Sequence, residues 1–309
     1  MATLTPMMQQ YLDIKEKYDD CILFFRLGDF YEMFFKDAQT ASRELEITLT
    51  GRDCGQEEKA PMCGVPFHSA EGYIARLVNK GYKVAICEQV EDPSVAKGIV
   101  KRDVVRVVTP GTVIDSSMLD ERKNNYLMSI YKSKDYFGIA AVDITTGEFS
   151  ATSVSWGNTI QKTLDEIAKF SPSEIITNKE MWKDNLIVSN IKNRFNSFIT
   201  CLDDERFSSE KAIDKFSEKL DESYRGEPNS FALNAAGALL KYIEKTQKVS
   251  LNHIQDVNLY KMEEFMVLDM STRRNLELSE TMREKSKKGT LLWSLDKTMT
   301  SMGGRTIRR

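Results

Sequence analysis

Residues 21–35 read CILFFRLGDFYEMFF and place two aromatic-rich apolar runs on either side of Gly28 and Asp29. Runs of this composition favour strands, and a glycine-aspartate pair between them is typical of a tight hairpin turn. The stretch therefore predicts two antiparallel strands joined by a short turn. Since side chains alternate along a strand, Phe30 and Glu32 are expected on the same face of the second strand.

Helices and further strands on both sides of this hairpin predict a mixed α/β domain over residues 1–115. A first helix is expected directly after Thr5, whose hydroxyl can cap it, and a second over about residues 37–45. A third is expected to begin with Ser69 as its cap and to end before Gly81, since glycine favours the position after a helix. Two later apolar runs predict buried strands: YKVAICEQV and DVVRVVTPGTVI.

The remainder of the chain predicts a linker, a second α/β domain and a helical segment. Residues 116–124 are polar and predict the linker, residues 125–255 predict the second domain, and residues 256–309 predict the start of a helical domain. The second domain is expected to contain a three-stranded meander with turns near Lys134 and Gly147, a helix over about 159–169, the strand SEIITN, a charged irregular region over 203–228 and a closing helix over about 229–246.

The composition is that of a globular protein without a general attraction for nucleic acid. The 309 residues are 41% hydrophobic and 29% charged, with a formal net charge of −3. A negative balance excludes strong non-specific DNA binding, so any DNA contact must come from local residues. No apolar run has the about 20 residues that a membrane span needs, and no secretory signal precedes the first helix. We therefore expect a cytoplasmic protein with no membrane partner.

The five cysteines are expected to be reduced and mostly buried thiols. No two of them have CxxC spacing, and the chain has only two histidines. A zinc site is hard to assemble from these residues, so no metal site is predicted.

Phe30 and Glu32 suit the reading of a base from the minor groove. An exposed aromatic ring can stack on a base or wedge between base steps, and a carboxylate can accept a hydrogen bond from a base or share a proton with a ring nitrogen. The alternative is that Phe30 belongs to the core and Glu32 to a solvated edge. A basic run near the last strand suits phosphate contacts or, alternatively, a solvated face: Lys97, Lys101, Arg102 and Arg106.

Asp143, in AAVDITTGEF, suits a metal-dependent nuclease of the RNase H type, which needs several carboxylates around divalent ions. The alternative is a structural aspartate in a strand or turn. Nothing in the sequence brings the other available carboxylates to it: Glu148, Asp165, Glu166 and Glu174. The motifs GxxxxGK[ST], GxSxG and HExxH are absent, so no catalytic residue is predicted and His68 is expected to be structural.

The first domain contains, in this order, TPMMQQYLDIK, FFRLGDFYEMFFKDA, APMCGVPFHSAEGYIARLVNKGYKVAICEQVEDP and VVRVVTPGTVID. The last part of the chain contains LDMSTRRNLEL and LDKTMTSMGGRTIRR. Together these segments closely resemble the N-terminal part of the MutS family of bacterial DNA mismatch repair proteins. The resemblance covers essentially the whole chain and is weakest between about residues 180 and 250.

The resemblance implies a mismatch-recognition domain over 1–115, a connector domain with an RNase H-like fold over 125–255, and the start of the helical core, or lever, domain over 256–309. It implies that Phe30 wedges into the minor groove and stacks on a mispaired or unpaired base, while Glu32 hydrogen-bonds that base. Further positions match family residues that touch DNA or line the wedge: Leu27, Arg52, Met62, Gln89 and Arg102.

The resemblance also implies partners of the full-length family. Its members continue through a DNA clamp and an ATPase that uses ATP and magnesium and forms a homodimer. The present chain is expected to be cut short before those parts. We therefore expect a monomeric fragment that is not an enzyme and holds no cofactor, with part of its helical segment exposed. The connector is expected to dock a MutL-type matchmaker protein.

The expected function is recognition of mispaired or unpaired bases in duplex DNA, which initiates mismatch repair. Two alternatives stay open: an RNase H-like nuclease, and a protein-docking fragment that does not bind DNA by itself.

Overall fold

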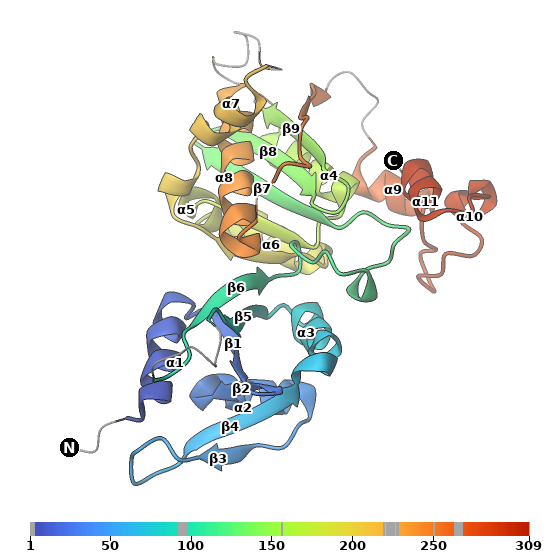
Figure 1. Cartoon of the computed structure of the whole chain (residues 1–309). Helices are drawn as coiled ribbons and strands as arrows, with labels where there is room; N and C mark the ends of the chain where they lie inside the picture. The colour runs from blue at the N-terminus through green and yellow to red at the C-terminus, as the bar shows by residue number, and fades with distance from the viewer. Residues whose placement is uncertain are drawn as a thin grey trace. The chain divides into compact units, whose positions relative to one another are not determined.

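The chain folds into two compact units (Figure 1). The computed structural model describes residues 4–91, 98–155, 157–218, 220, 226, 229–249, 251–262 and 268–308. Unit 1 comprises Met1–Met118 and Glu244–Val249, and unit 2 comprises Leu119–Ile243 and Ser250–Arg309. Each contains one sheet with helices, which confirms the predicted mixed α/β class. In the described ranges, no helix has both the length and the apolar character needed to cross a membrane.

Unit 1 is built on a six-stranded sheet in the order β3-β4-β2-β1-β5-β6. The predicted hairpin is confirmed: β1 and β2 pair antiparallel, Leu27 lies opposite Phe30, and Gly28 takes a positive φ of 57° in the turn. Strand β5 runs parallel to β1, whereas the other pairs are antiparallel. The strands are β1 (Cys21–Leu27), β2 (Phe30–Phe34), β3 (Thr50–Arg52), β4 (Ala60–Pro66), β5 (Lys83–Gln89) and β6 (Arg102–Val108).

Helices cover both faces of this sheet: α1 (Pro6–Lys17) lies on one face, and α2 (Phe35–Leu45) and α3 (Ala70–Asn79) lie on the other (Figure 1). Two short 3-10 turns, η1 (Phe67–Ser69) and η2 (Ser116–Met118), complete the unit. Tyr11 of α1 packs edge-on against Phe25 and Phe34, with ring centroids 5.5 and 5.0 Å away. These buried rings hold α1 against the sheet, because burying a large apolar side chain contributes about 1.5–3 kcal/mol.

The three predicted helices of unit 1 are confirmed, and Thr5 and Ser69 occupy the N-cap positions of α1 and α3, but neither side chain makes the expected capping hydrogen bond. The Thr5 hydroxyl makes no capping bond, although the Thr5 amide donates to the Cys54 carbonyl at 3.0 Å. The Ser69 hydroxyl donates to the carbonyl of Pro66 at 3.2 Å instead of accepting from α3. The reason is that Ser69 already belongs to η1, so its side chain bonds the preceding turn. Gly81 follows α3 with a φ of 86°, as expected.

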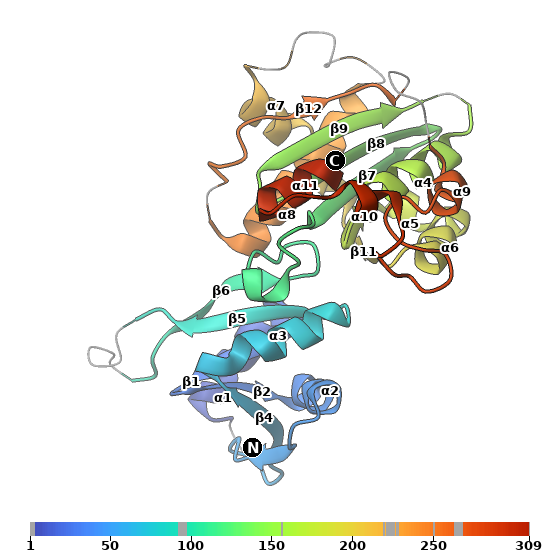
Figure 2. The same ribbon diagram turned by 90° about the vertical axis from the view of Figure 1, so that its right-hand side faces the viewer.

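Unit 2 has a second six-stranded sheet in the order β11-β10-β7-β8-β9-β12. The predicted meander is confirmed, and Figure 2 shows β9, β8 and β7 side by side. Lys134 and Gly147 take positive φ values of 54° and 76° in its two turns. Strands β10 and β11 then add in parallel to β7, which agrees with the expected α/β connector fold. The strands are β7 (Tyr126–Ser133), β8 (Tyr136–Asp143), β9 (Glu148–Val154), β10 (Glu174–Thr177), β11 (Phe198–Cys201) and β12 (Asn258–Leu259).

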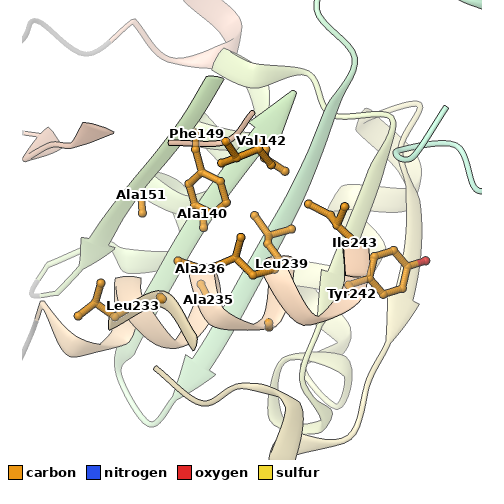
Figure 3. Close-up of a cluster of buried hydrophobic side chains, with 14 of the residues drawn as sticks. Ala140, Val142, Phe149, Ala151, Leu233, Ala235, Ala236, Leu239, Tyr242 and Ile243 are labelled. Atoms are coloured by element: carbon orange, nitrogen blue, oxygen red, sulfur yellow. The ribbon is translucent and has the colours of Figure 1, made fainter. Parts of the chain in front are cut away.

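Helix α8 (Ser230–Gln247) packs along one face of this sheet (Figure 3). Its small residues Ala235 and Ala236 and the larger Leu239 meet Ala140 and Val142 of β8 in one buried cluster. A second cluster joins the opposite face to α4 (Thr159–Phe170) and α6 (Asn185–Arg194). The sheet therefore has two buried faces, as a layered α/β domain requires.

Two parts of unit 2 differ from the sequence prediction. The region over 203–228 is not wholly irregular, because it contains η3 (Asp204–Arg206) and α7 (Glu210–Phe216). Ala212 and Phe216 of α7 are buried, and this contact stabilises a segment whose charge obscures its helical pattern. Three further elements were not predicted: α5 (Lys179–Trp182), α6 and β11.

The polar segment before β7 is tied to the last part of the chain. Arg122 donates through Nη2 to the Thr298 hydroxyl at 2.7 Å and forms an ion pair with Asp296 at 3.2 Å. The last part contains short helices, α9 (Met270–Asn275), α10 (Leu291–Leu295) and α11 (Ser301–Arg308). Several of its large apolar side chains are exposed, as expected: Leu276, Met282, Leu291, Trp293, Leu295, Met299 and Met302.

Candidate functional site

The seven residues predicted for the site all lie on one face of the unit 1 sheet. Side chains of residues paired across a ladder point to the same face, and those two apart along a strand do so as well. Through these pairings, every one of the six strands contributes at least one site residue to the face that α1 partly covers: Leu27, Phe30, Glu32, Arg52, Met62, Gln89 and Arg102.

This face is divided into a covered part and an open part. α1 covers the ends of β1 and β2 that contain Leu23, Phe25 and Phe34, and all three are buried. Phe30, at the opposite end of β2, has 46% of its surface exposed. The alternative in which Phe30 is a core aromatic is therefore wrong. Its ring lies at the hairpin tip, where it is free to meet a ligand.

Glu32 lies beside Phe30 on this face, but its side chain is only 15% exposed, and Arg52 forms an ion pair with it through Nη1 and the carboxylate oxygen Oε2. Gly64 of β4 is paired with Glu32. A Cβ on Gly64 would lie 3.4 Å from Cγ of Glu32 and 3.9 Å from Cδ1 of Phe30. Gly64 thus adds no side chain beside the aromatic ring and the carboxylate, where a Cβ would already be in contact with both.

Leu27 and Met62 pack against the edge of the covered core, and both are partly buried. The carbonyl of Met62 accepts a hydrogen bond from the Thr50 hydroxyl at 3.1 Å, which fixes β4 to the edge strand β3. Gln89 is half-buried at the end of β5. These three residues border the open part without forming its centre.

Arg102 is on the same face but lies inside the unit, where only 9% of it is exposed. Its Nε donates to the carbonyl of Arg26 at 2.7 Å, and its Nη1 donates to Oε1 of Gln10 at 3.1 Å and to the carbonyl of Val100 at 2.9 Å. Its Cζ lies 5.1 Å from the ring centroid of Phe25. Burial lowers the pKa of this guanidinium. Arg102 therefore ties α1, β1 and β6 together and does not reach the open part.

The basic run expected near β6 does not form one continuous surface. Lys101 is exposed, but Arg106 forms an ion pair with Asp115 at 3.1 Å. Lys97, the first member of the run, lies outside the described residues. A phosphate contact from this run would rest on Lys101 among the described members.

Sequence reasoning missed a second exposed aromatic near the hairpin tip. Phe67 has 42% of its surface exposed, and its amide donates to the carbonyl of Asp29 in the turn at 2.9 Å. Cζ of Arg26 lies 3.7 Å from the ring centroid of Phe67, a cation-π contact on the other side of the sheet. The signal in the sequence is the aromatic residue directly after Pro66.

The carboxylates of unit 2 do not converge on a metal site. Asp143 is buried and accepts hydrogen bonds from the amide and hydroxyl of Thr145 at 2.8 and 2.6 Å. Strand pairing places Asp143 on the face of Tyr126 and Glu174 on the face of Leu127, which are opposite faces of β7. Within the described ranges, no three histidine, cysteine or acidic residues are grouped to hold a metal ion.

The cysteines are free thiols, as predicted. Cys21, Cys54, Cys63 and Cys87 are buried, and Cys201 is partly exposed. Burial raises the pKa of the Cys63 thiol to about 11 and that of Cys87 to about 12, so both stay protonated near neutral pH. They behave as core residues and not as nucleophiles.

Comparison with known proteins gives matches along nearly the whole chain. The model of MutS domain I matches residues 5–117, that of MutS domain II matches 125–255, and that of MutS domain III matches 271–309. The DNA mismatch repair proteins MutS of Acetivibrio thermocellus and Ruminiclostridium cellulolyticum are each 67% identical to it, over 100% of this chain and 36% of their own length. That of Lachnoclostridium phytofermentans is 55% identical, over 100% of this chain and 33% of its own. The chain therefore spans about a third of the length of the curated relatives it matches.

Proposed function

The chain belongs to the MutS family, and from that membership we propose that it recognises mispaired or unpaired bases in duplex DNA. In this proposal Phe30 enters the minor groove and stacks on the base, and Glu32 hydrogen-bonds the base. The observation that carries it is the exposed ring of Phe30 at a hairpin tip, beside Glu32 on one face of the sheet. An aromatic side chain in this position has no role in the core.

The physical basis of selectivity is the ease with which a defective base step opens. Inserting a ring requires unstacking, which is cheapest where pairing is already wrong. Stacking of a base on an aromatic side chain then contributes about 1–3 kcal/mol. The net charge of −3 limits attraction to intact duplex, so insertion supplies the discrimination.

We propose supporting DNA contacts for the four residues that border or belong to the open part: Leu27, Arg52, Met62 and Gln89. Arg102 receives a different role, because its hydrogen bonds are made within unit 1. It positions the strands that hold the hairpin.

For the rest of the chain the proposals follow the family. Residues 1–115 are the mismatch-recognition domain, 116–124 a linker, 125–255 a connector that docks a MutL-type matchmaker, and 256–309 the start of the helical core. ATP, magnesium and homodimer formation belong to the full-length protein in the cytoplasm. A nuclease is not proposed, since the carboxylates of unit 2 face different ways and pair with neighbouring groups.

The test compares binding of the 309-residue chain to three duplexes by fluorescence anisotropy: one with a G·T mismatch, one with a single unpaired base, and one fully paired. We expect tighter binding to the two defective duplexes. Phe30→Ala should reduce this preference about 5- to 150-fold, the equivalent of about 1–3 kcal/mol of stacking. Because the ring is 46% exposed, folding should change little.

Phe67→Ala is the matched control, since it removes an equally exposed ring from the same unit on the other side of the sheet. It should leave the preference largely intact. Equal binding of all duplexes by the unmodified chain would contradict the proposed function. An equal loss in both variants would contradict the specific role of Phe30.

A further inference from the structure

A cavity of about 470 Å³ lies in unit 2, where the polar segment before β7 meets the last part of the chain. This volume is in the range of about 300–1,000 Å³ that small-molecule sites occupy. The lining combines an indole ring and four cationic side chains with one carboxylate. Its charged and aromatic members are Arg122, Lys287, Trp293, Asp296, Lys297 and Arg308.

Asp296 does not cancel the positive charge of the cavity, because its carboxylate is already bonded within unit 2. Its Oδ1 accepts hydrogen bonds from the Thr298 amide at 3.0 Å and hydroxyl at 2.6 Å, and Arg122 pairs with it at 3.2 Å. The Thr298 hydrogen bonds, with Arg122 and Arg308 nearby, hold the pKa of Asp296 below its usual range. Arg122 and Asp296 therefore form a neutral pair, and three cations of the lining are in excess.

Those three cations have no strong partner among the described residues. Lys297 is exposed and forms no ion pair with any of them. Lys287 lies 3.5 Å from a carboxylate oxygen of Asp120, but both side chains are exposed, and such surface pairs contribute little. The Nε atom of Arg308 is buried and has no hydrogen-bond partner in the described ranges. Buried unpaired donors are rare in folded proteins, so this guanidinium is open to an acceptor from a ligand.

The backbones of Trp293 and Lys287 are held in place by one buried residue, Thr290. Its hydroxyl accepts a hydrogen bond from the Trp293 amide at 3.1 Å and donates to the Lys287 carbonyl at 2.8 Å. The Trp293 side chain nevertheless leaves 52% of the residue exposed. An aromatic ring and a cation on fixed backbone positions form a preorganised site, which lowers the entropy cost of binding.

The ring and the cations suit different parts of one ligand. Clustered cations favour phosphate groups, and an exposed indole favours a flat ring such as a nucleic-acid base. We propose that this cavity binds a nucleotide with two or more phosphates, whose base stacks on Trp293 while its phosphates contact Lys287, Lys297 and Arg308. The sequence contains no GxxxxGK[ST] motif, so this site is not a P-loop.

The alternative is a cationic surface that attracts any small anion. Such a surface would bind pyrophosphate as tightly as a nucleoside diphosphate, because the base would add nothing. In the proposed site, stacking adds about 5- to 150-fold to the affinity. A nucleoside without phosphates would lack the contacts with the cations. The two alternatives therefore predict different results for the same three ligands: ADP, pyrophosphate and adenosine.

The experiment titrates the full 309-residue chain with these ligands by isothermal titration calorimetry in magnesium-free buffer. Without magnesium, only side chains can neutralise the phosphates. We expect a single site for ADP, with an affinity at least about fivefold higher than that for pyrophosphate or adenosine. Raising the salt concentration should weaken ADP binding, because the phosphate contacts lie partly in solvent.

Trp293→Ala should lower the affinity for ADP at least about fivefold and leave that for pyrophosphate unchanged. Lys297→Gln should lower both about three- to tenfold, the change expected for one partly exposed charge-assisted contact. The matched controls are Trp182→Ala, which removes an exposed indole of α5, and Lys288→Gln, which removes an exposed charge outside the lining. Both should stay within about twofold of the unmodified chain.

Three results would overturn the inference. The first is no saturable binding of ADP up to about 1 mM. The second is equal affinity for ADP and pyrophosphate, which would leave only general attraction of anions. The third is an equal loss in Trp182→Ala and Trp293→Ala, which would place the ring contact outside the cavity. None of these outcomes depends on mismatch recognition, because every residue of the proposed site belongs to unit 2.

Discussion

Replacing Gly138 by alanine should destabilise unit 2, because the added methyl group has no room. Gly138 lies in β8 against the first turn of α8. A Cβ on Gly138 would lie 1.8 Å from the carbonyl oxygen of Phe231 and 2.3 Å from its carbonyl carbon. Ordinary van der Waals contact begins at 3.4 Å, so α8 or β8 must move by about 1.5 Å. A backbone carbonyl cannot rotate away as a flexible side chain can.

The shift would spread through the buried cluster of Figure 3, since α8 supplies much of it. Overpacking costs about 1–3 kcal/mol and occasionally more, and a clash with backbone belongs at the upper end. We therefore expect the free energy of unfolding of unit 2 to fall by about 3 kcal/mol. For a unit of this size, that lowers the midpoint of thermal unfolding by about 6–12 °C.

Tryptophan fluorescence reports the unfolding of unit 2 separately from that of unit 1. The chain has three tryptophans, and none occurs in the residues of unit 1. The control is Gly72→Ala in α3, where a Cβ meets no atom within 4 Å. It should leave the fluorescence transition unchanged and stabilise unit 1 by up to about 1 kcal/mol, since alanine favours helices over glycine. A Gly138→Ala protein that unfolds within about 0.5 kcal/mol of the unmodified chain would refute the described seating of α8 on β8.

Two further predictions concern unit 1. Arg102→Ala should lower its stability by about 3 kcal/mol, because three hydrogen bonds of a buried cation are lost, whereas Lys101→Ala should stay within about 0.5 kcal/mol. Hydrogen exchange of the β1 and β6 amides measures the stability of unit 1 in both variants. Equal protection in Arg102→Ala and Lys101→Ala would contradict the buried placement of Arg102. Burial raises the pKa of Cys63 from 9.0 to about 11. The unfolded chain then loses a proton that the folded chain keeps, so stability should fall between pH 9 and 11. Cys63→Ala should reduce the dependence of the urea midpoint on pH between pH 9 and 11. An unchanged dependence would contradict this assignment to Cys63.

Local pattern was sufficient for the hairpin, the meander and most helices. The aromatic runs around Gly28 and Asp29 produced the predicted strands, because strand propensity, turn chemistry and alternation agree there. The segment with α7 was missed for the opposite reason. Its charged residues dominate the local pattern, and only burial of Ala212 and Phe216 against the core stabilises a helix. Ser69 is the N-cap residue of α3 but makes no side-chain capping bond, and its hydroxyl bonds the preceding 3-10 turn instead.

The candidate site shows the same division between what local sequence pattern predicts and what depends on tertiary packing. Alternation along one strand was enough to place Phe30 and Glu32 on a common face, and the resemblance to the MutS family supplied the other residues. The predicted site residues come from six strands and share one face only because of the strand order and register. Both follow from pairings between segments that are distant in the sequence. Exposure is likewise a property of the folded unit. Phe30 is open because α1 ends short of it, whereas Arg102 is enclosed because Gln10 of α1 and the carbonyl of Arg26 surround it.

The amino-acid sequence by itself thus determined most of the local elements, the family and the placement of Phe30 and Glu32 on one face of a strand, because these depend on residue types at short spacing. Only the tertiary structure decided that Arg52 reaches Glu32, that Arg102 supports the sheet instead of facing a ligand, and that Asp143 and Glu174 lie on opposite faces. The physical reason is that ion pairing, burial and metal binding depend on distances across strands. Those distances exist only after long-range pairing has set the register of each sheet.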